Sequence, residues 1–229
     1  MFEKDYNIDN QDHITIEDLI GDAHSAHGLA TPLKPGAFNV PDEEKIRLIA
    51  SKFHDILDIL GMDLNDESIK GTPKRVAKMY VQEIFGGLNP ANKPTPTLFE
   101  NSYKYNQMLV EKNILVQSTC EHHFVPILGK AHIAYFSAGK VVGLSKLNRI
   151  VDYYSRRPQV QERLTNQIAE DLKEMLQTRD VAVIIDAEHL CVKSRGIRDP
   201  HSSTITSSFH GKFLNESTRH ELMRYITMD

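Results

Sequence analysis

Val-Ala-Val-Ile-Ile-Asp-Ala-Glu-His-Leu-Cys-Val, residues 181–192, is the stretch that most strongly indicates the fold. Its β-branched and apolar residues predict a strand. Runs of similar character at 108–118 and 129–136 predict two more strands, and residues 203–213 predict a weaker fourth. The fold class then depends on what lies between these segments.

Two helices are expected between the second and third strands. Ser145 can cap the first, and Pro158 opens the second. Their apolar faces consist of Leu147, Ile150, Val151 and Tyr154, and of Val160, Leu164, Ile168, Leu172 and Met175. This order predicts an α+β domain: an antiparallel four-stranded sheet with two helices packed on one face. The edges of such a sheet invite pairing with other subunits.

The region before this sheet has a different character. Residues 12–29 predict a short helix, and apolar spacing predicts longer helices from Pro41 to Gly61 and from Thr72 to Gly86. The chain is therefore divided into an appendage and linker (1–40), an N-terminal helical region (41–96) and an α+β domain (97–229).

Composition indicates a soluble globular protein of 229 residues, 40% of them hydrophobic. No apolar run reaches bilayer length, and the N-terminus lacks a signal pattern, so we expect no membrane association. Only two cysteines are present, which fits a reducing cytoplasm. The net charge of -4 argues against nucleic acid as a partner. Any polyanionic ligand would need a local basic cluster.

Both cysteines lie beside histidines. Cys120 and His123 have a tight ligand spacing, and Cys191 can supply a third ligand from a distant segment. Two thiolates and one imidazole favour zinc, with a fourth position left open for water, as in catalytic sites. Two alternatives stay open: a pair of inert buried thiols, or a structural zinc whose fourth ligand is a neighbouring histidine.

Two further histidines adjoin these ligands. Alternation along the expected strand places His189 and Cys191 on one face, while His122 precedes His123. Histidines beside a zinc-activated water suit proton transfer near neutral pH. The alternative is that either ring only supports the site from behind or is a satisfied core histidine.

Basic side chains occur near the same motifs. Lys146 and Arg149 lie one turn apart at a helix start, Arg195 follows Cys191, and Arg75 belongs to another basic pair. Such groups can bind phosphate oxygens. Each stretch alone is more often a solvated face.

Glu162 lies at the start of the second expected helix. Its carboxylate could accept two hydrogen bonds from the N1–H and amino group of guanine. The simpler interpretation is that the acid only complements the helix dipole.

Four motifs in order resemble the GTP cyclohydrolase I family. They are Ser-Thr-Cys-Glu-His-His at 118–123, Gly-Leu-Ser-Lys-Leu-Asn-Arg at 143–149, Arg-Pro-Gln-Val-Gln-Glu-Arg at 157–163, and His-Leu-Cys-Val-Lys-Ser-Arg-Gly at 189–196. The similarity covers residues 42 to 227. Residues 1–40 lie mostly outside it.

The resemblance implies a tunnelling-fold catalytic domain that assembles into a homodecamer of two pentamers, with active sites between subunits. It implies conversion of GTP and water to formate and 7,8-dihydroneopterin triphosphate, the first step of tetrahydrofolate and pterin biosynthesis. The implied roles are zinc binding by Cys120, His123 and Cys191; proton transfer by His122 and His189; purine binding by Gln161 and Glu162; a ribose contact by Ser145; and triphosphate binding by Arg75, Lys146, Arg149 and Arg195.

Three other classes of protein fit the sequence less well. Zinc nucleobase deaminases carry a His-x-Glu and Pro-Cys-x-x-Cys signature that the chain lacks. Queuosine-pathway nitrile reductases share the tunnelling fold but use a cysteine nucleophile and NADPH. A structural-zinc scaffold would not need the polar residues His122, His189 and Glu162 near its metal.

Overall fold

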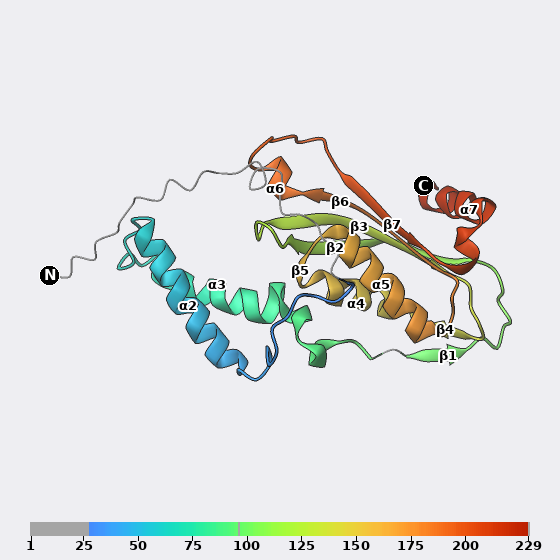
Figure 1. The fold of residues 1–229 in the computed structure, drawn as a ribbon, viewed down its shortest axis with the longest axis horizontal. Helices are drawn as coiled ribbons and strands as arrows, with labels where there is room; N and C mark the ends of the chain where they lie inside the picture. The colour runs from blue at the N-terminus through green and yellow to red at the C-terminus, as the bar shows by residue number, and fades with distance from the viewer. Residues whose placement is uncertain (1–27, 96, 229) are drawn as a thin grey trace.

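The computed structural model describes residues 28–95 and 97–228 and shows an α+β protein. A five-stranded sheet in the order β5-β2-β3-β6-β7 forms its centre (Figure 1). The helix expected at 12–29 falls almost entirely outside the described residues. No helix in the described part is both long and apolar enough to cross a membrane.

The four long strands are the ones that the sequence predicts. They are β2 (Leu109–Cys120), β3 (Pro126–Tyr135), β6 (Val181–His189) and β7 (Thr204–Phe209), and neighbours pair antiparallel. The β3–β6 register runs from Ile127 opposite His189 to Tyr135 opposite Val181. The ends of β2 and β6 therefore lie at the same end of the sheet.

A fifth strand replaces the expected start of the second helix. Pro158 does not open that helix: β5 (Pro158–Gln159) pairs parallel with the end of β2, and α5 (Gln161–Leu176) begins after it. The Glu121 N–H donates to the Gln159 carbonyl (3.0 Å). Proline's fixed φ suits extended as well as helical backbone, so the available bonds to β2 decide the conformation. The four-strand prediction misses this addition.

The third strand also ends earlier than predicted. β6 stops at His189, and residues Leu190–Lys193 form a helical turn, α6. Its partner β3 starts at Pro126, next to the Ile127 that pairs with His189. Beyond that point β6 has no β3 backbone to pair with, and the chain satisfies its own bonds in a turn.

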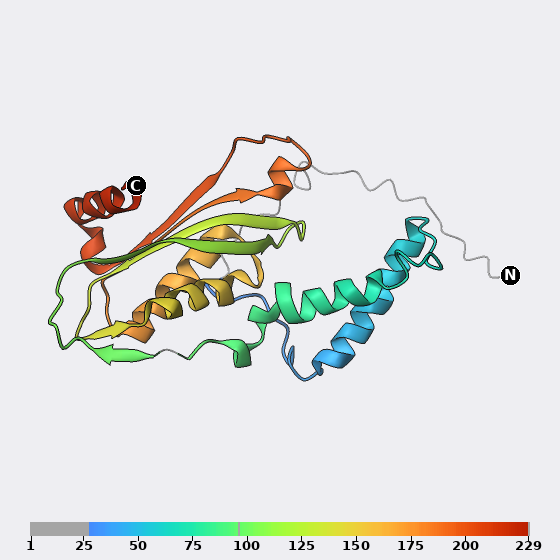
Figure 2. The same ribbon diagram turned by 180° about the vertical axis from the view of Figure 1, so that it is seen from behind.

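Two helices cover one face of the sheet, as predicted (Figures 1 and 2). α4 (Leu144–Ser155) begins one residue before Ser145, with Gly143 at the cap position and no side-chain cap, so the predicted Ser145 cap is wrong. The packed apolar stripes of α4 and α5 are Leu147, Ile150, Val151, Leu164, Ile168 and Leu172. Each fully buried aliphatic side chain stabilises the fold by about 1.5–3 kcal/mol.

Within the described residues, the opposite face of the sheet is covered at one end only. There η4 (Gly211–Leu214) and α7 (Glu216–Thr227) bury Phe213 and Leu222 against Met108, Ala134 and Ile184. A separate two-stranded sheet, β1 (Leu98–Glu100) with β4 (Lys140–Val142), precedes α4. The sequence had indicated none of these four elements.

The N-terminal helical region lies beside the sheet and does not cover it (Figure 2). It contains α2 (Asp42–Ile59), α3 (Thr72–Lys78), the π-helix η1 (Met79–Ile84), and the 3-10 turns η2 (Gly86–Leu88) and η3 (Pro90–Asn92). The second predicted helix thus changes from α to π geometry at Met79. No residue of α2 is fully buried in the described chain: its apolar residues Ile46, Ile49 and Phe53 are half-buried, and Ile59 is 77% exposed.

Candidate active site

Cys120 is the last residue of β2, and His123 lies in the tight turn that leads to β3. The Cys120 N–H donates to the Val125 carbonyl (2.9 Å), and the Phe124 N–H donates to the Cys120 carbonyl (2.9 Å). Phe124 has a left-handed backbone (φ 54°), which is rare for a bulky residue and typical of constrained sites. These bonds fold the turn back so that His123 returns to the Cys120 thiol.

Cys191 reaches the same place from β6. Pairing of Ile127 with His189 brings the end of β6 beside this turn. The helical turn α6 then directs Cys191 toward it, and the ligand atoms of Cys120, His123 and Cys191 lie within 4.8 Å of one another. The three predicted ligands therefore converge. The expected alternation of His189 and Cys191 along one strand is wrong, because β6 ends between them.

The donor set fits zinc. Donors around a tetrahedral zinc lie roughly 3.5–3.8 Å apart, so small side-chain rotations would close the observed group on an ion. Burial raises the pKa of the Cys191 thiol, and the neighbouring Cys120 thiol raises that pKa further. A bound cation would reverse this preference by favouring the thiolates. Cys120 is buried, Cys191 half-buried and His123 exposed.

His122 lies against the same group without joining it. Its Nδ1 is 3.6 Å from Cys120 Sγ, and its ring meets that of His123 edge-on, with centroids 6.3 Å apart. The imidazole is half-buried. It is placed where a proton could pass to or from a ligand bound beside the thiol.

His189 is the second non-ligand histidine. Its Nε2 lies 2.8 Å from Oε1 of Gln161, the first residue of α5. Burial lowers the pKa of the His189 imidazole, the Glu162 carboxylate raises it, and His122 lowers it. A lowered pKa favours the neutral ring at pH 7.

The start of α5 is tied to the metal-ligand turn by an ion pair that the sequence analysis missed. Arg163 donates two bonds to Glu121, with Nη1–Oε2 at 2.5 Å and Nη2–Oε1 at 3.1 Å. Both side chains are mostly buried. The sequence feature that could have indicated this ion pair is an acidic and a basic residue in two motifs that also contain predicted site residues. Glu162, between Gln161 and Arg163, is exposed.

Two predicted phosphate-binding arginines come from different elements. Arg195 lies just beyond α6 and is exposed, and its charge acts to lower the Cys191 pKa. Arg75 lies on α3, where its guanidinium donates to Thr72 Oγ1 (2.8 Å) and to the Ser68 carbonyl (3.3 Å). Arg195 thus accompanies the metal group, whereas Arg75 belongs to the N-terminal helical region.

Ser145, Lys146 and Arg149 lie at the other end of the sheet. Their helix α4 follows Val142, whose N–H is 3.5 Å from the Tyr135 hydroxyl. Tyr135 is eight residues along β3 from Ile127, about 26 Å at 3.3 Å per residue. These three side chains are therefore not brought to the metal group within one chain.

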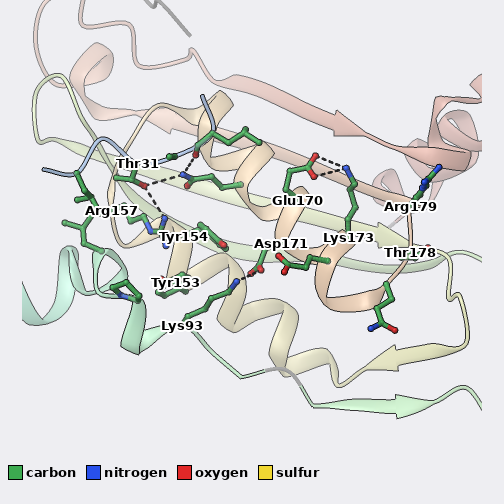
Figure 3. A pocket seen from close by; sticks show the side chains of 18 residues that line it. Thr31, Lys93, Tyr153, Tyr154, Arg157, Glu170, Asp171, Lys173, Thr178 and Arg179 are labelled. Carbon is green, nitrogen blue, oxygen red and sulfur yellow. Dashed lines mark hydrogen bonds and ion pairs between the residues drawn. The ribbon is translucent and has the colours of Figure 1, made fainter. Parts of the chain in front are cut away.

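A cavity of about 880 Å³ lies away from the metal group, between residues 29–33 and the surface of α5 (Figure 3). Four of its charged lining residues form two ion pairs: Lys93 binds Asp171 at 2.5 Å, and Lys173 binds Glu170 at 2.8 Å. None of the predicted site residues lines it. We do not assign it to the active site.

The sequence as a whole is similar to known proteins. The family model described as GTP cyclohydrolase I matches residues 49–227. The chain is 59% identical over 222 residues to "GTP cyclohydrolase 1" of Flavobacterium johnsoniae, covering 97% of this chain and 98% of that protein. It is 50% identical over 209 residues to "GTP cyclohydrolase 1" of Escherichia coli O1:K1 / APEC, covering 91% and 94%. A solved archaeosine synthase QueF-Like structure matches 47% of this chain and 97% of its own, with TM-score 0.40 and 17% identity, too low to carry an inference.

Proposed function

The chain belongs to the GTP cyclohydrolase I family, and from this premise we propose that it is a zinc-dependent hydrolase converting GTP and water to formate and 7,8-dihydroneopterin triphosphate. The observation that carries the zinc dependence is the convergence of Cys120, His123 and Cys191, from two distant segments, beside two histidines outside the ligand group. This reaction would be the first step of tetrahydrofolate and pterin biosynthesis.

Bound zinc would supply Lewis-acid chemistry that makes water a nucleophile near neutral pH. Two thiolate ligands offset the charge of the ion, so the protein must help to remove a proton. His122 and His189 are the groups for this work. His122, next to Cys120, transfers a proton at the purine ring. His189 donates a proton when the ribose opens, before reclosure as a pterin.

Glu162 accounts for the choice of guanine. Its carboxylate is exposed in the first turn of α5, and its charge reaches His189. A carboxylate there accepts two hydrogen bonds, from N1–H and from the amino group of guanine, whereas adenine offers no such pair of donors. Gln161, although adjacent in sequence, is buried.

Triphosphate binding is assigned to Arg75, Lys146, Arg149 and Arg195, with Ser145 near the ribose. The metal group lies at the Ile127 end of β3, and α4 starts near Tyr135 at the other end, about 26 Å away along the strand. A lysine or arginine side chain spans only a fraction of this distance, which supports a site that a second subunit completes. Exposed apolar residues on α2, such as Leu48 and Ile56, and the free edge of β7 support further subunit contacts. We infer a homodecamer of two pentamers.

The antiparallel sheet with α4 and α5 on one face is consistent with the tunnelling fold, and we assign residues 97–229 to that catalytic domain. Residues 41–96 then form the N-terminal helical region, and residues 1–40 form the appendage and linker. Within the linker, Thr31 Oγ1 accepts a bond from Arg157 (3.2 Å), so its end is attached to the catalytic domain.

The test is to incubate the purified protein with GTP and to measure formate together with pterin fluorescence. Activity that a chelator removes and added zinc restores is the expected result. A deaminase would instead release ammonia, a nitrile reductase would consume NADPH, and a scaffold would leave GTP intact. Hydrolysis that persists at full rate after complete metal removal would contradict the zinc dependence.

A further inference from the structure

Gln161 is one of the least exposed polar residues of the described chain, yet it lies next to a reactive histidine. The side chain is 1% exposed, and its Oε1 is 2.8 Å from His189 Nε2. A group so enclosed is poorly placed to touch a substrate that enters from solvent. We propose that Gln161 is a positioning residue, which acts through His189 by fixing the orientation and tautomer of its imidazole.

The orientation of the Gln161 amide follows from its other contacts. Nε2 lies 2.8 Å from the Thr204 carbonyl and 3.1 Å from the Ile185 carbonyl. Both carbonyl oxygens can only accept hydrogen bonds, so the NH₂ group must face them. The reverse orientation would bring three oxygen atoms together without a proton between them. Oε1 therefore faces His189.

Two threonines fix the same orientation independently. Thr165 Oγ1 donates to the Gln161 carbonyl (2.8 Å), which uses its only proton. Thr206, 2.6 Å from Thr165 Oγ1, must then donate to it, and its own oxygen is left to accept from Gln161 Nε2 at 3.2 Å. These three hydrogen bonds form a closed ring in which each group donates to the next. If the Gln161 amide were flipped, its oxygen would face the Thr206 oxygen with no proton between them.

The consequence falls on His189. Since Oε1 can only accept, Nε2 of His189 must carry a proton, and the neutral ring holds its lone pair on Nδ1. Nδ1 is then the atom that can take up and deliver a proton in the reaction. The anchors of the amide lie on β6 and β7 and within α5, so three elements hold the ring in one orientation before substrate arrives.

The chain offers a matched control in Gln159. It is equally buried, at 0% exposed, and its Nε2 donates to the Tyr154 carbonyl (3.0 Å) and to Gln167 Oε1 (2.8 Å). It lies two residues before Gln161, but its side chain bonds are to other groups than His189. Gln159→Met therefore removes a buried amide without touching the histidine.

The experiment compares zinc-loaded wild type with Gln161→Met, Gln161→Glu and Gln159→Met. Because this inference rests on the proposed function, wild type is assayed alongside for formate and pterin. We expect Gln161→Met to lower kcat by about 10–100-fold, part of the roughly 10²–10⁴-fold that a positioned acid or base contributes, with KM for GTP and zinc content nearly unchanged. Gln161→Glu, which still offers His189 an acceptor, should retain more turnover than Gln161→Met.

A purely structural role predicts the opposite order, since an ionised carboxylate facing two carbonyl oxygens is worse than methionine. With an active wild type, three results would each overturn the inference. They are lower turnover in Gln161→Glu than in Gln161→Met, a loss of kcat in Gln159→Met equal to that in Gln161→Met, and a raised KM with unchanged kcat in Gln161→Met. An inactive wild type would overturn the proposed function and this inference together. As a second measurement, adding Gln161→Met to His189→Ala should cost no further turnover, whereas an additive loss would show that Gln161 acts elsewhere.

Discussion

The two ends of the main sheet differ in which predicted site residues a single chain brings together. At the end where β2 and β6 stop, Cys120, His123 and Cys191 meet within 4.8 Å. At the other end, about 26 Å along β3 from Ile127 to Tyr135, α4 begins, and its first turns carry Ser145, Lys146 and Arg149. The metal-ligand group is thus formed within one chain, whereas the proposed triphosphate contacts of Lys146 and Arg149 would have to come from a neighbouring subunit. Strand register determines both outcomes, because it aligns the ends of β2 and β6 and separates them from the start of α4.

The largest effect is expected from removing a metal ligand. Cys120→Ser, His123→Ala and Cys191→Ser should each abolish formate release and zinc binding, since loss of one of three ligands removes most of the affinity. Zinc content and turnover of the purified variants are the measurements. His201→Ala, an exposed histidine outside the group, should retain both. A ligand variant that hydrolyses GTP normally without zinc would refute the assignment.

The same geometry predicts oxidation when zinc is removed. The thiols of Cys120 and Cys191 lie within 4.8 Å, and a disulfide needs β-carbons about 3.8 Å apart, so modest rotation would allow the bond. In air, oxygen would accept the two electrons, and the protein would become inactive. Thiol titration should find no free thiol in the chelated, air-exposed protein and two after reductant. Two thiols that persist without reductant would contradict this prediction.

A smaller effect is expected at Glu162. Glu162→Gln should weaken GTP binding by about 1–3 kcal/mol, because an amide NH₂ would face the guanine donors. KM and kcat for GTP are compared with those of Glu174→Gln, an exposed acid further along the same helix that should change neither. Unchanged kinetics in Glu162→Gln, with ATP still rejected, would mean that another group reads the base.

Mixed oligomers provide the most direct comparison of the two ends. When inactive Lys146→Ala and Cys191→Ser proteins are dissociated and reassociated together, about a quarter of sites should recover if each site draws on two subunits at random. Mixing Cys120→Ser with Cys191→Ser should recover nothing, because one subunit supplies both ligands. Recovery in the second mixture, or full activity of a monomer on a sizing column, would contradict the proposed division.

Sequence patterns predicted the long strands and the two packed helices because these depend on local periodicity. Leu147 and Ile150 on α4, and Leu164 and Ile168 on α5, are buried as their spacing indicates. The predicted boundaries of helices and strands were wrong where pairing with a distant segment decides the local backbone conformation. Pro158 became a strand because β2 offered it partners, and the segment after His189 became a turn because β3 no longer did. The ion pair of Arg163 with Glu121 depends on the same contact.

The sequence by itself determined which residue types are available: two thiols with neighbouring histidines, a helix-start glutamate and scattered basic groups. It also determined the core-facing stripes, since side-chain spacing is a property of the local backbone. Tertiary structure alone decided that Cys191 reaches Cys120 from a helical turn, that Gln161 presents its oxygen to His189, and that Lys146 lies at the far end of the sheet. These outcomes depend on strand register and on burial between segments distant in sequence, and no local pattern encodes a distance across the fold.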